Sequence, residues 1–436
     1  MTRRLDIRDR KFEKSFRAVL NAKRENDVDV NETVAAILAD VRTRGDAAVI
    51  DYTARFDRLD LTPGTLRITA DEIADARGQC DDETVAALEL AAARISEFHQ
   101  RQMPDDLDYE DEAGIRLGYR WSAMQSAGLY VPGGTAAYPS SVLMNAMPAR
   151  VAGVERIVMV VPTPDGQINP LVLVAAAVSG IDEIYRIGGA QAVGALAYGT
   201  ATIDPVVKIV GPGNAYVAAA KRQVFGTVGI DMIAGPSEIL VVADGENDPS
   251  WIAADLLSQA EHDTAAQSIL ISDDLDFAQA VEEAIDAHLA TLPRSEIAQK
   301  SWQDNGCVIV VDALDEAIPL IDRIAPEHLE LAVADPEALA DRVHNAGAIF
   351  LGRFTPEAVG DYVAGPNHVL PTARSARFSS GLGVLDFLKR TSVIGCSSEG
   401  LRQIGPAAIS LAEAEGLDAH ARSVAIRLNL PGDGGA

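Results

Sequence analysis

Short β-branched segments alternate with alanine-rich segments from about residue 126 onward, and this alternation constrains the fold more than any other feature. The candidate strands are 129–131, 156–161, 183–187, 206–210, 239–242, 268–272, 308–311 and 348–351. Alternating strands and helices are typical of a largely parallel sheet with helices on both faces. Because the pattern restarts after residue 237, the sequence predicts two α/β units rather than one large sheet.

The two ends of the chain have a different pattern. Residues before about 126 are predicted to be mostly helical, with one helix between an Asn31 N-cap and Gly45 and a second at about 82–98. The acidic stretch 105–112 is predicted to be a solvated loop. After about residue 381 the strand pattern disappears, and the chain is expected to end in helices.

Composition and charge limit the classes of function. The chain has 436 residues, of which 48% are hydrophobic and 23% charged, as in folded soluble proteins. Its net charge is 37 − 64 = −27, which argues against nucleic acid or an anionic membrane as a partner. The longest apolar run, 171–178, is far below the roughly 18 residues that cross a bilayer.

The cysteines and the N-terminus indicate a compartment. Cys80, Cys307 and Cys396 are widely spaced and form no CxxC pair, so we expect neither a disulfide framework nor a thiolate zinc cluster. No apolar stretch follows the basic N-terminal residues, so no secretory signal is expected. We therefore predict a cytoplasmic protein.

Four glycine-rich turns lie where strands are expected to end, at 131–134, 188–191, 211–214 and 234–237. Ligands of open α/β sheets bind at the carboxyl ends of strands, where glycine lets the backbone approach them closely. None of the turns has the spacing GxGxxG, and no GxxxxGK[ST] motif occurs. The turns therefore predict a ligand crevice without identifying the ligand.

Four of the seven histidines have neighbours suited to chemistry, whereas His99, His288 and His344 favour structural or surface roles. Gln259 and His262 are three residues apart, so both lie on one face of a helix, which alone is weak evidence for a metal site.

Glu327 and His328 follow Pro326, and such a carboxyl–imidazole pair suits proton transfer near neutral pH. A solvated surface pair is an equally good explanation of the pattern. His368 follows Asp361 closely, and His420 follows Glu415. Carboxylate and imidazole groups form oxygen–nitrogen sites that zinc accepts, but separation in sequence does not show whether these residues meet.

Seven motifs together resemble the histidinol dehydrogenase family. They are Gly128-Leu-Tyr-Val-Pro-Gly-Gly134, Gly188-Gly-Ala-Gln-Ala192, Val210-Gly-Pro-Gly-Asn214, Ala234-Gly-Pro-Ser-Glu238, Gln259-Ala-Glu-His262, Ala325-Pro-Glu-His328 and Gly365-Pro-Asn-His-Val-Leu-Pro371, the last followed by Ala376-Arg-Phe-Ser379. The match covers nearly the whole chain in the order and spacing of that family.

The resemblance implies two incomplete Rossmann-like parallel-sheet α/β domains in an aldehyde-dehydrogenase-like architecture. The expected parts are an N-terminal extension at 1–28, a first α/β domain at 29–128 and 239–380 that carries metal and catalytic residues, a second at 129–238 with a nucleotide crevice, and a helical, dimer-contacting tail at 381–436. A homodimer whose active site is shared between subunits is also implied.

The resemblance further implies oxidation of L-histidinol to L-histidine in two NAD-dependent steps through a bound aldehyde. Zinc would be held by Gln259, His262, Asp361 and His420. His328 would take the alcohol proton and Glu327 would activate water. The substrate contacts would be Ser237, Gln259, His262, His328, Asp361, His368, Glu415 and His420, and the NAD contacts would be Tyr130, Gln191 and Asn214. His420 and Glu415 would serve the partner's site.

Other functions remain open from the sequence. The nearest alternative is a zinc- and NAD-dependent dehydrogenase of another small polyol or amino alcohol. A zinc hydrolase in which Glu327 activates water directly belongs to a different class, and a non-enzymatic metal-binding module is a more remote alternative.

Overall fold

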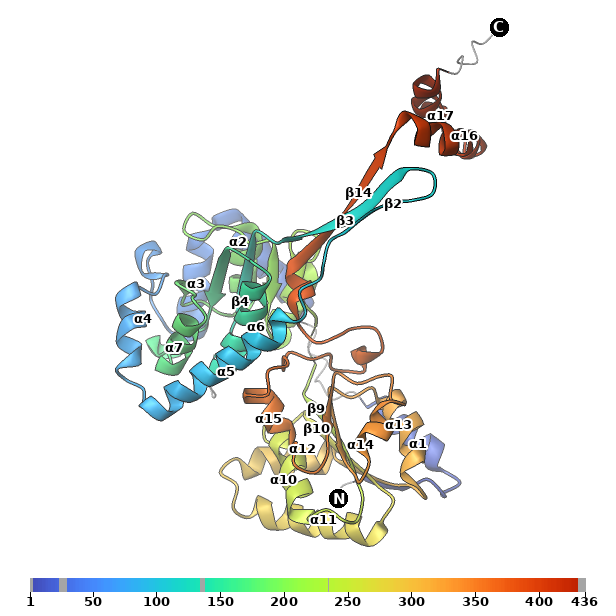
Figure 1. Cartoon of the computed structure of the whole chain (residues 1–436). Coiled ribbons are helices and arrows are strands. Elements are labelled where there is room, and N and C mark those ends of the chain that lie inside the picture. Colours follow the sequence, from blue (N-terminus) through green and yellow to red (C-terminus); the bar gives the residue numbers. More distant parts are fainter. Residues whose placement is uncertain (1–2, 23–29, 134–137, 234, 430–436) are drawn as a thin grey trace. The chain divides into compact units, whose positions relative to one another are not determined.

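The computed structural model describes residues 3–22, 30–133, 138–233 and 235–429, and these fall into two compact units. The first unit comprises residues 1–102 and 125–387, and the second comprises 103–124 and 388–436. Gly134 and Ala234 of the predicted glycine turns lie outside the described residues. Figure 1 shows the ribbon coloured along the sequence.

One sheet of the first unit has the strand order β6-β5-β4-β7-β8, and all its neighbouring strands are parallel. Its strands are β4 (Ser126–Tyr130), β5 (Arg156–Val160), β6 (Glu183–Tyr185), β7 (Lys208–Val210) and β8 (Gly229–Ile230). The chain runs from β4 outward through β5 to β6, and then returns to place β7 on the other side of β4. In open α/β sheets such a reversal creates a crevice at the carboxyl ends of the two central strands, here β4 and β7.

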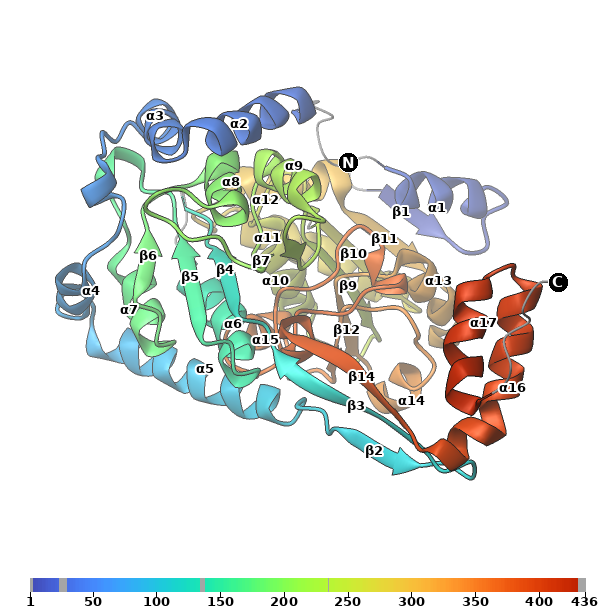
Figure 2. The ribbon, with the colours of Figure 1, turned by 90° about the horizontal axis from the view of Figure 1, so that it is seen from above.

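Helices cover both faces of this sheet (Figure 2). One face carries α2 (Asn31–Arg44), α3 (Asp46–Asp57), α8 (Gly189–Tyr198) and α9 (Ala215–Val224), and the other carries α4 (Ala70–Arg77), α5 (Asp82–Gln100), α6 (Pro139–Val151) and α7 (Pro170–Val178). Helix α7 begins as its sequence dictates, because Pro170 occupies its first position and Asn169 Oδ1 accepts the Leu171 N–H at 2.9 Å.

The other sheet of the first unit is also entirely parallel, with the order β1-β11-β10-β9-β12-β13. Its strands are β1 (Arg3–Asp6), β9 (Glu238–Ala243), β10 (Gln267–Ser272), β11 (Cys307–Val310), β12 (His328–Ala332) and β13 (Ala348–Leu351). Alternate residues of β9 enter different cores: Leu240 and Val242 face one helical layer, whereas Ile239 and Val241 face the other. Both faces of the strand are therefore apolar, as expected for a parallel sheet covered on both sides.

The first of these layers contains α1 (Phe12–Leu20), α13 (Ala317–Ile324) and α14 (Pro336–Ala340), and the second contains α10 (Pro249–Ala260), α11 (Leu275–Leu289) and α12 (Ser295–Asn305). A short helix, α15 (Glu357–Tyr362), follows β13. Short 3₁₀ turns occupy Pro63–Thr65, Pro164–Gly166, Leu314–Glu316, Ser375–Arg377, Val384–Phe387 and, in the second unit, Ile426–Leu428.

The second unit is an antiparallel ribbon that leads into two helices (Figure 1). Strand β3 (Ile115–Ala123) pairs with β2 (Leu107–Glu110) on one side and with β14 (Leu388–Cys396) on the other. Helices α16 (Ser398–Ala414) and α17 (Asp418–Ala425) follow and pack against each other. The segment 105–112 is exposed as predicted, but β2 within it shows that it is not a loop. The tail ends in two helices as predicted, but β14 precedes them, so the expectation that the strand pattern disappears after about residue 381 is wrong. β2 is exposed at every residue and β14 at most of its residues, so neither has the apolar alternation by which a half-buried strand is recognised in the sequence.

The assignment of residues 29–128 also needs correction. We predicted that they pack with 239–380, but α2 and α3 share an apolar core with the β4–β8 sheet. Gly194 of α8 permits the close approach, since a Cβ there would lie 3.2 Å from Leu38 of α2. The expected N-terminal extension supplies β1, which pairs with β11. Asn31 is the first helical residue of α2 rather than its N-cap, which is Val30.

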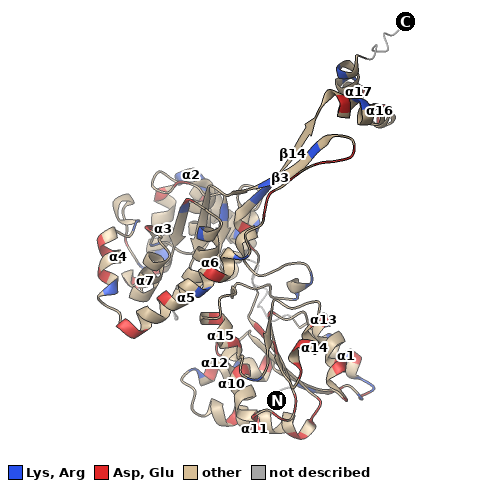
Figure 3. Ribbon diagram, in the orientation of Figure 1, with Lys and Arg blue, Asp and Glu red and all other residues tan. Residues whose placement is uncertain are grey.

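The distribution of charged side chains and the apolarity of the helices agree with the acidic composition of the sequence. Acidic side chains are spread over several helices, including α5 and α11 (Figure 3). In the described parts of the chain, the length and apolarity that a bilayer-spanning helix requires are not found together in any helix.

Candidate active site

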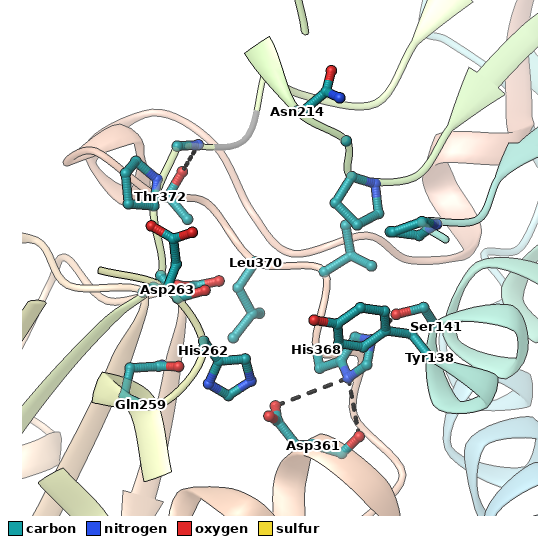
Figure 4. Close-up of a pocket in the computed structure, with 18 of the residues that line it drawn as sticks. Tyr138, Ser141, Asn214, Gln259, His262, Asp263, Asp361, His368, Leu370 and Thr372 are labelled. Atoms are coloured by element: carbon teal, nitrogen blue, oxygen red, sulfur yellow. Dashed lines mark hydrogen bonds and ion pairs between the residues drawn. The ribbon is translucent and has the colours of Figure 1, made fainter. Parts of the chain in front are cut away.

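A cavity of about 450 Å³ lies in the first unit, where the two sheets contribute opposite strand ends. The carboxyl ends of β4 and β7 supply Tyr130 and 212–214, whereas 235–237 and His328 lie at the amino ends of β9 and β12. Figure 4 shows Gln259, His262 and Asp361 near one end of this pocket and Asn214 near the other. The expectation that every glycine turn follows a strand end is therefore corrected for 234–237, because its described residues lead into β9.

His328 is the first residue of β12, and its side chain is almost fully buried. Its Nδ1 lies 2.9 Å from the carbonyl oxygen of Glu238 and 2.9 Å from Gln259 Nε2. When Nδ1–H donates to that carbonyl, Nε2 keeps its lone pair. Among the described residues Nε2 has no hydrogen-bond partner. Burial lowers the pKa of His328 below its ordinary 6.5, so the imidazole is neutral and able to accept a proton at neutral pH.

Glu327 lies beside it at the end of a sharp turn, in which Ala325 adopts a left-handed conformation with φ 48°. Its Oε2 accepts the Glu238 N–H at 2.9 Å. Burial raises the pKa of Glu327 well above 4.5, and the carboxylates of Glu238 and Asp361 raise it further. A carboxyl group held in this way suits general-base chemistry near neutral pH. The alternative of a solvated surface pair is contradicted, because both side chains are buried.

Three of the four predicted zinc ligands line the pocket. Gln259 lies in the last turn of α10 and His262 just beyond it, and Asp361 lies in α15. His262 Nδ1 is 2.9 Å from the Ser258 carbonyl oxygen, so that a donating Nδ1–H leaves Nε2 available to a ligand. Burial and the neighbouring Glu357 raise the pKa of Asp361 to about 9. A nearby cation would oppose this effect, which fits a metal site.

His420 belongs to the second unit, where it is an exposed residue of α17. Glu415 is also exposed there, directly after α16. Their participation in the site therefore stays a prediction.

Glu357 is a carboxylate that the sequence analysis missed. Its Oε1 lies 3.8 Å from His328 Nε2, and Asp361 Oδ1 lies 3.7 Å from the same nitrogen. These three residues form a group whose donor atoms lie within 4.8 Å of one another. The i, i+4 spacing of Glu357 and Asp361 places both on one helix face, and this is the signal that would have found Glu357.

His368 lies beside Asp361 and across the pocket from His262 (Figure 4). Its Nδ1 is 3.0 Å from the Asp361 carbonyl oxygen and its Nε2 is 3.3 Å from Ser141 Oγ. Burial lowers the pKa of His368 to about 4, so the ring is neutral. Tyr138, the N-cap residue of α6, and Ser141, in the first turn of that helix, line the same wall. They were not predicted, because they belong to no chemical motif. Ser237 also lines the pocket, so that its contact with substrate stays a prediction, and Asp263 and Thr372 are further lining residues.

Two of the three predicted nucleotide contacts line the pocket. The Tyr130 hydroxyl accepts the Gly189 N–H at 3.0 Å, and burial raises its pKa to about 12. Asn214 caps α9, since its Oδ1 accepts the backbone N–H groups of Tyr216 and Val217. Gln191 is buried in α8 and does not line the pocket, and its Oε1 has no hydrogen-bond partner among the residues described. A nucleotide contact from Gln191 therefore remains a prediction.

A sequence profile of the histidinol dehydrogenase family matches residues 20–428. The chain belongs to this family. It is 67% identical to the histidinol dehydrogenase of Rhodospirillum rubrum over 430 residues, covering 98% of this chain and 99% of that protein. It is also 67% identical to that of Ruegeria pomeroyi, covering 98% of each. The crystal structure of histidinol dehydrogenase from Elizabethkingia anophelis matches with a TM-score of 0.94, 37% identity and 98% coverage of both chains.

These findings confirm the family, the parallel-sheet α/β fold and the assignment of the protein as an oxidoreductase. The expected non-enzymatic alternative is thereby contradicted, as is the hydrolase without redox chemistry.

Proposed function

We propose that this protein oxidises L-histidinol to L-histidine in two NAD-dependent steps, with the intermediate aldehyde held in the pocket and zinc bound beside it. The observation that carries the proposal is the buried Glu327–His328 pair, which faces the same cavity as Gln259, His262 and Asp361. Family membership supports the substrate, because the relatives are named for it.

The donor set fits zinc. An amide oxygen, an imidazole nitrogen and a carboxylate oxygen are ligands that zinc accepts, and thiolates are not required. Two buried acceptors that lie 3.8 Å apart, His328 Nε2 in the cavity wall and Glu357 Oε1 behind it, have no hydrogen-bond partner among the described residues, which favours a positively charged occupant nearby. Gln259, His262 and Asp361 would hold the ion, together with His420 of a second copy. Zinc, when bound, would orient the substrate through its amino and imidazole nitrogens.

Each base has one proton to move. In the first oxidation His328 Nε2 takes the hydroxyl proton of the alcohol while a hydride leaves the carbinol carbon. In the second, the Glu327 carboxylate takes a proton from the water that adds to the aldehyde. The resulting hydrate loses the next hydride. NAD, when bound, accepts the hydride in both steps, so that one histidinol yields two NADH.

The location of Tyr130 and Asn214 supports hydride transfer from the substrate to a nucleotide bound at that end of the pocket. Both lie at the carboxyl ends of β4 and β7, on either side of the strand-order reversal, which is where open α/β sheets bind nucleotides. Retention of the aldehyde in the pocket would keep a reactive intermediate from escaping. We further propose a cytoplasmic homodimer in which Glu415 and His420 complete the partner's site.

The stoichiometry of NADH tests this function. Purified protein with zinc, NAD and L-histidinol should form two NADH per substrate consumed. NADH formed only with another polyol or amino alcohol would favour the nearest alternative substrate class, and the absence of NADH with every alcohol would refute the proposal.

A matched pair of variants links the reaction to the site. His328→Gln should lower the rate of alcohol oxidation by about 10²–10⁴-fold. His344→Gln, which alters an exposed histidine, should leave the rate unchanged.

A further inference from the structure

A buried ion pair lies behind the loop that follows β7, outside the pocket itself. Lys221 of α9 and Asp231, which follows β8, are in contact, and their side chains are 3% and 1% exposed. Neither residue lines the cavity. Because taking two charges out of water is costly, a buried pair of this kind needs compensating contacts. The nearby backbone supplies them.

Both charged groups bond to the same residue, Gly211. The Lys221 ammonium donates to the Gly211 carbonyl oxygen at 2.9 Å, and Asp231 Oδ2 accepts the Gly211 N–H at 2.8 Å. Gly211 is buried and lies just beyond the last residue of β7, so the sheet does not pair these two backbone groups. Unpaired, they would be buried polar groups without partners. The ion pair supplies the hydrogen-bond partners that no neighbouring strand supplies, and its charge-assisted hydrogen bonds hold both the N–H and the carbonyl group of Gly211.

The geometry of Gly211 shows how tightly this point is fixed. Its φ is +112°, and a Cβ there would lie 2.1 Å from the carbonyl oxygen of Tyr130. The same Tyr130 lines the pocket, as do Pro212, Gly213 and Asn214 immediately after Gly211. Lys221 lies two turns along α9 from its cap Asn214, so one helix carries both the ion pair and the pocket residue. A shift of Gly211 would therefore move the pocket wall.

We infer that Lys221 and Asp231 are positioning residues that hold the Gly211–Asn214 loop in the shape that receives NAD. This inference rests on the proposed function, because it takes the loop at β7 as the nucleotide side of the pocket. The pair acts through Gly211 and touches no substrate, and the other end of the cavity, with His262 and Glu327, is built from a different sheet.

The double variant Lys221→Met/Asp231→Asn tests the inference, since it removes both charges and leaves no uncompensated one. We expect the KM for NAD to rise about tenfold or more, as small displacements of positioning groups have effects of this size. The KM for histidinol and kcat at saturating NAD should stay close to their wild-type values. The control is Lys300→Met, which breaks the exposed Lys300–Asp304 pair and should change none of these constants.

Two results would overturn the inference. One is a folded double variant whose KM for NAD is unchanged. The other is a double variant whose kcat falls by the same factor as its KM for NAD rises. If the wild-type protein reduces NAD and the double variant gives either of these results, only the positioning role is rejected. Wild-type protein that forms no NADH rejects the proposed function as well.

Amide hydrogen exchange of the unmodified protein gives a second measurement that does not depend on the variant folding. The Gly211 amide should exchange much more slowly than the amide of the exposed residue Ala215 at the start of α9, because its N–H is bonded to a buried carboxylate. Exchange of Gly211 at the rate of the Ala215 amide would show that Asp231 does not hold the Gly211 N–H.

Discussion

The substitution Glu327→Gln separates the two proposed oxidations. The glutamine amide oxygen is able to accept the Glu238 N–H that the carboxylate accepts at 2.9 Å, so the local structure is retained. Because burial already disfavours the ionised carboxyl group, its replacement by a neutral amide should change the free energy of unfolding by no more than about 1 kcal/mol. What the amide lacks is the capacity to take a proton from water.

The expected magnitude follows from that loss. General-base catalysis contributes about 10²–10⁴-fold, which corresponds to about 3–5 kcal/mol of activation free energy. Oxidation of L-histidinal should therefore fall by this factor, whereas the first hydride transfer from L-histidinol depends on His328 and should fall by less than about tenfold. Single-turnover NADH formation with each substrate measures the two steps separately.

The control for this variant is Glu330→Gln. Glu330 is a buried residue of β12, the strand that begins directly after Glu327, and burial likewise raises its pKa well above 4.5, but it does not line the pocket. The control should leave the ratio of the two rates unchanged. Equal losses of both steps in Glu327→Gln would refute the division of labour between Glu327 and His328.

Three further predictions concern pH, metal and backbone. Burial lowers the pKa of His328 below 6.5 and raises that of Glu327 well above 4.5, and both bases work only when deprotonated. In pre-steady-state pH profiles, alcohol oxidation should therefore persist below pH 6.5, whereas aldehyde oxidation should decline at a pH above the carboxylate's usual range. His262→Asn should lose bound zinc and activity, as elemental analysis of the purified protein would show. Gly211→Ala should lower the free energy of unfolding by at least about 1–3 kcal/mol, measured by denaturant titration.

Matched variants make these outcomes decisive. An alcohol-oxidation profile centred at or above pH 6.5 would contradict the effect of burial on His328. His288→Asn should keep full zinc occupancy, and an equal occupancy in His262→Asn would remove His262 from the ligand set. Gly226 has a similar φ of +102° but open space around it. Gly226→Ala therefore isolates backbone strain, and equal destabilisation of both alanine variants would contradict the close approach of Gly211 to Tyr130.

Local patterns in the sequence were sufficient to predict most of the strands in the two parallel sheets. β9 and β10 are short apolar runs that pack against helices on both faces, and a run of this kind is recognisable without tertiary information. β12 was not predicted, because its first and third residues are His328 and Glu330, polar side chains that the fold nevertheless buries. The strand that carries the proposed base departs from the apolar pattern because of its chemistry.

The chemical types of the site residues came from the motifs, but their convergence did not. Gln259 and His262 share a helix end, so their proximity follows from spacing alone. Asp361 lies about a hundred residues further on, and only the packing of α15 near β12 places its carboxylate 3.7 Å from His328 Nε2. Glu357 was detectable only through its i, i+4 spacing from Asp361, and its closeness to His328 likewise depends on the packing of α15.

The amino-acid sequence alone determined the parallel α/β class, the helix and strand periodicities and the kinds of groups available for proton transfer and metal binding. These properties depend on neighbours within a few residues, where hydrophobic periodicity and turn chemistry act. Tertiary structure decided that one sheet offers its carboxyl ends and the other its amino ends to a common cavity, and that α2 and α3 cover the β4–β8 sheet. It also decided which carboxyl groups are buried beside an imidazole. Burial and contact between distant segments depend on the packing of the whole unit, and that packing sets the pKa values on which the proposed chemistry depends.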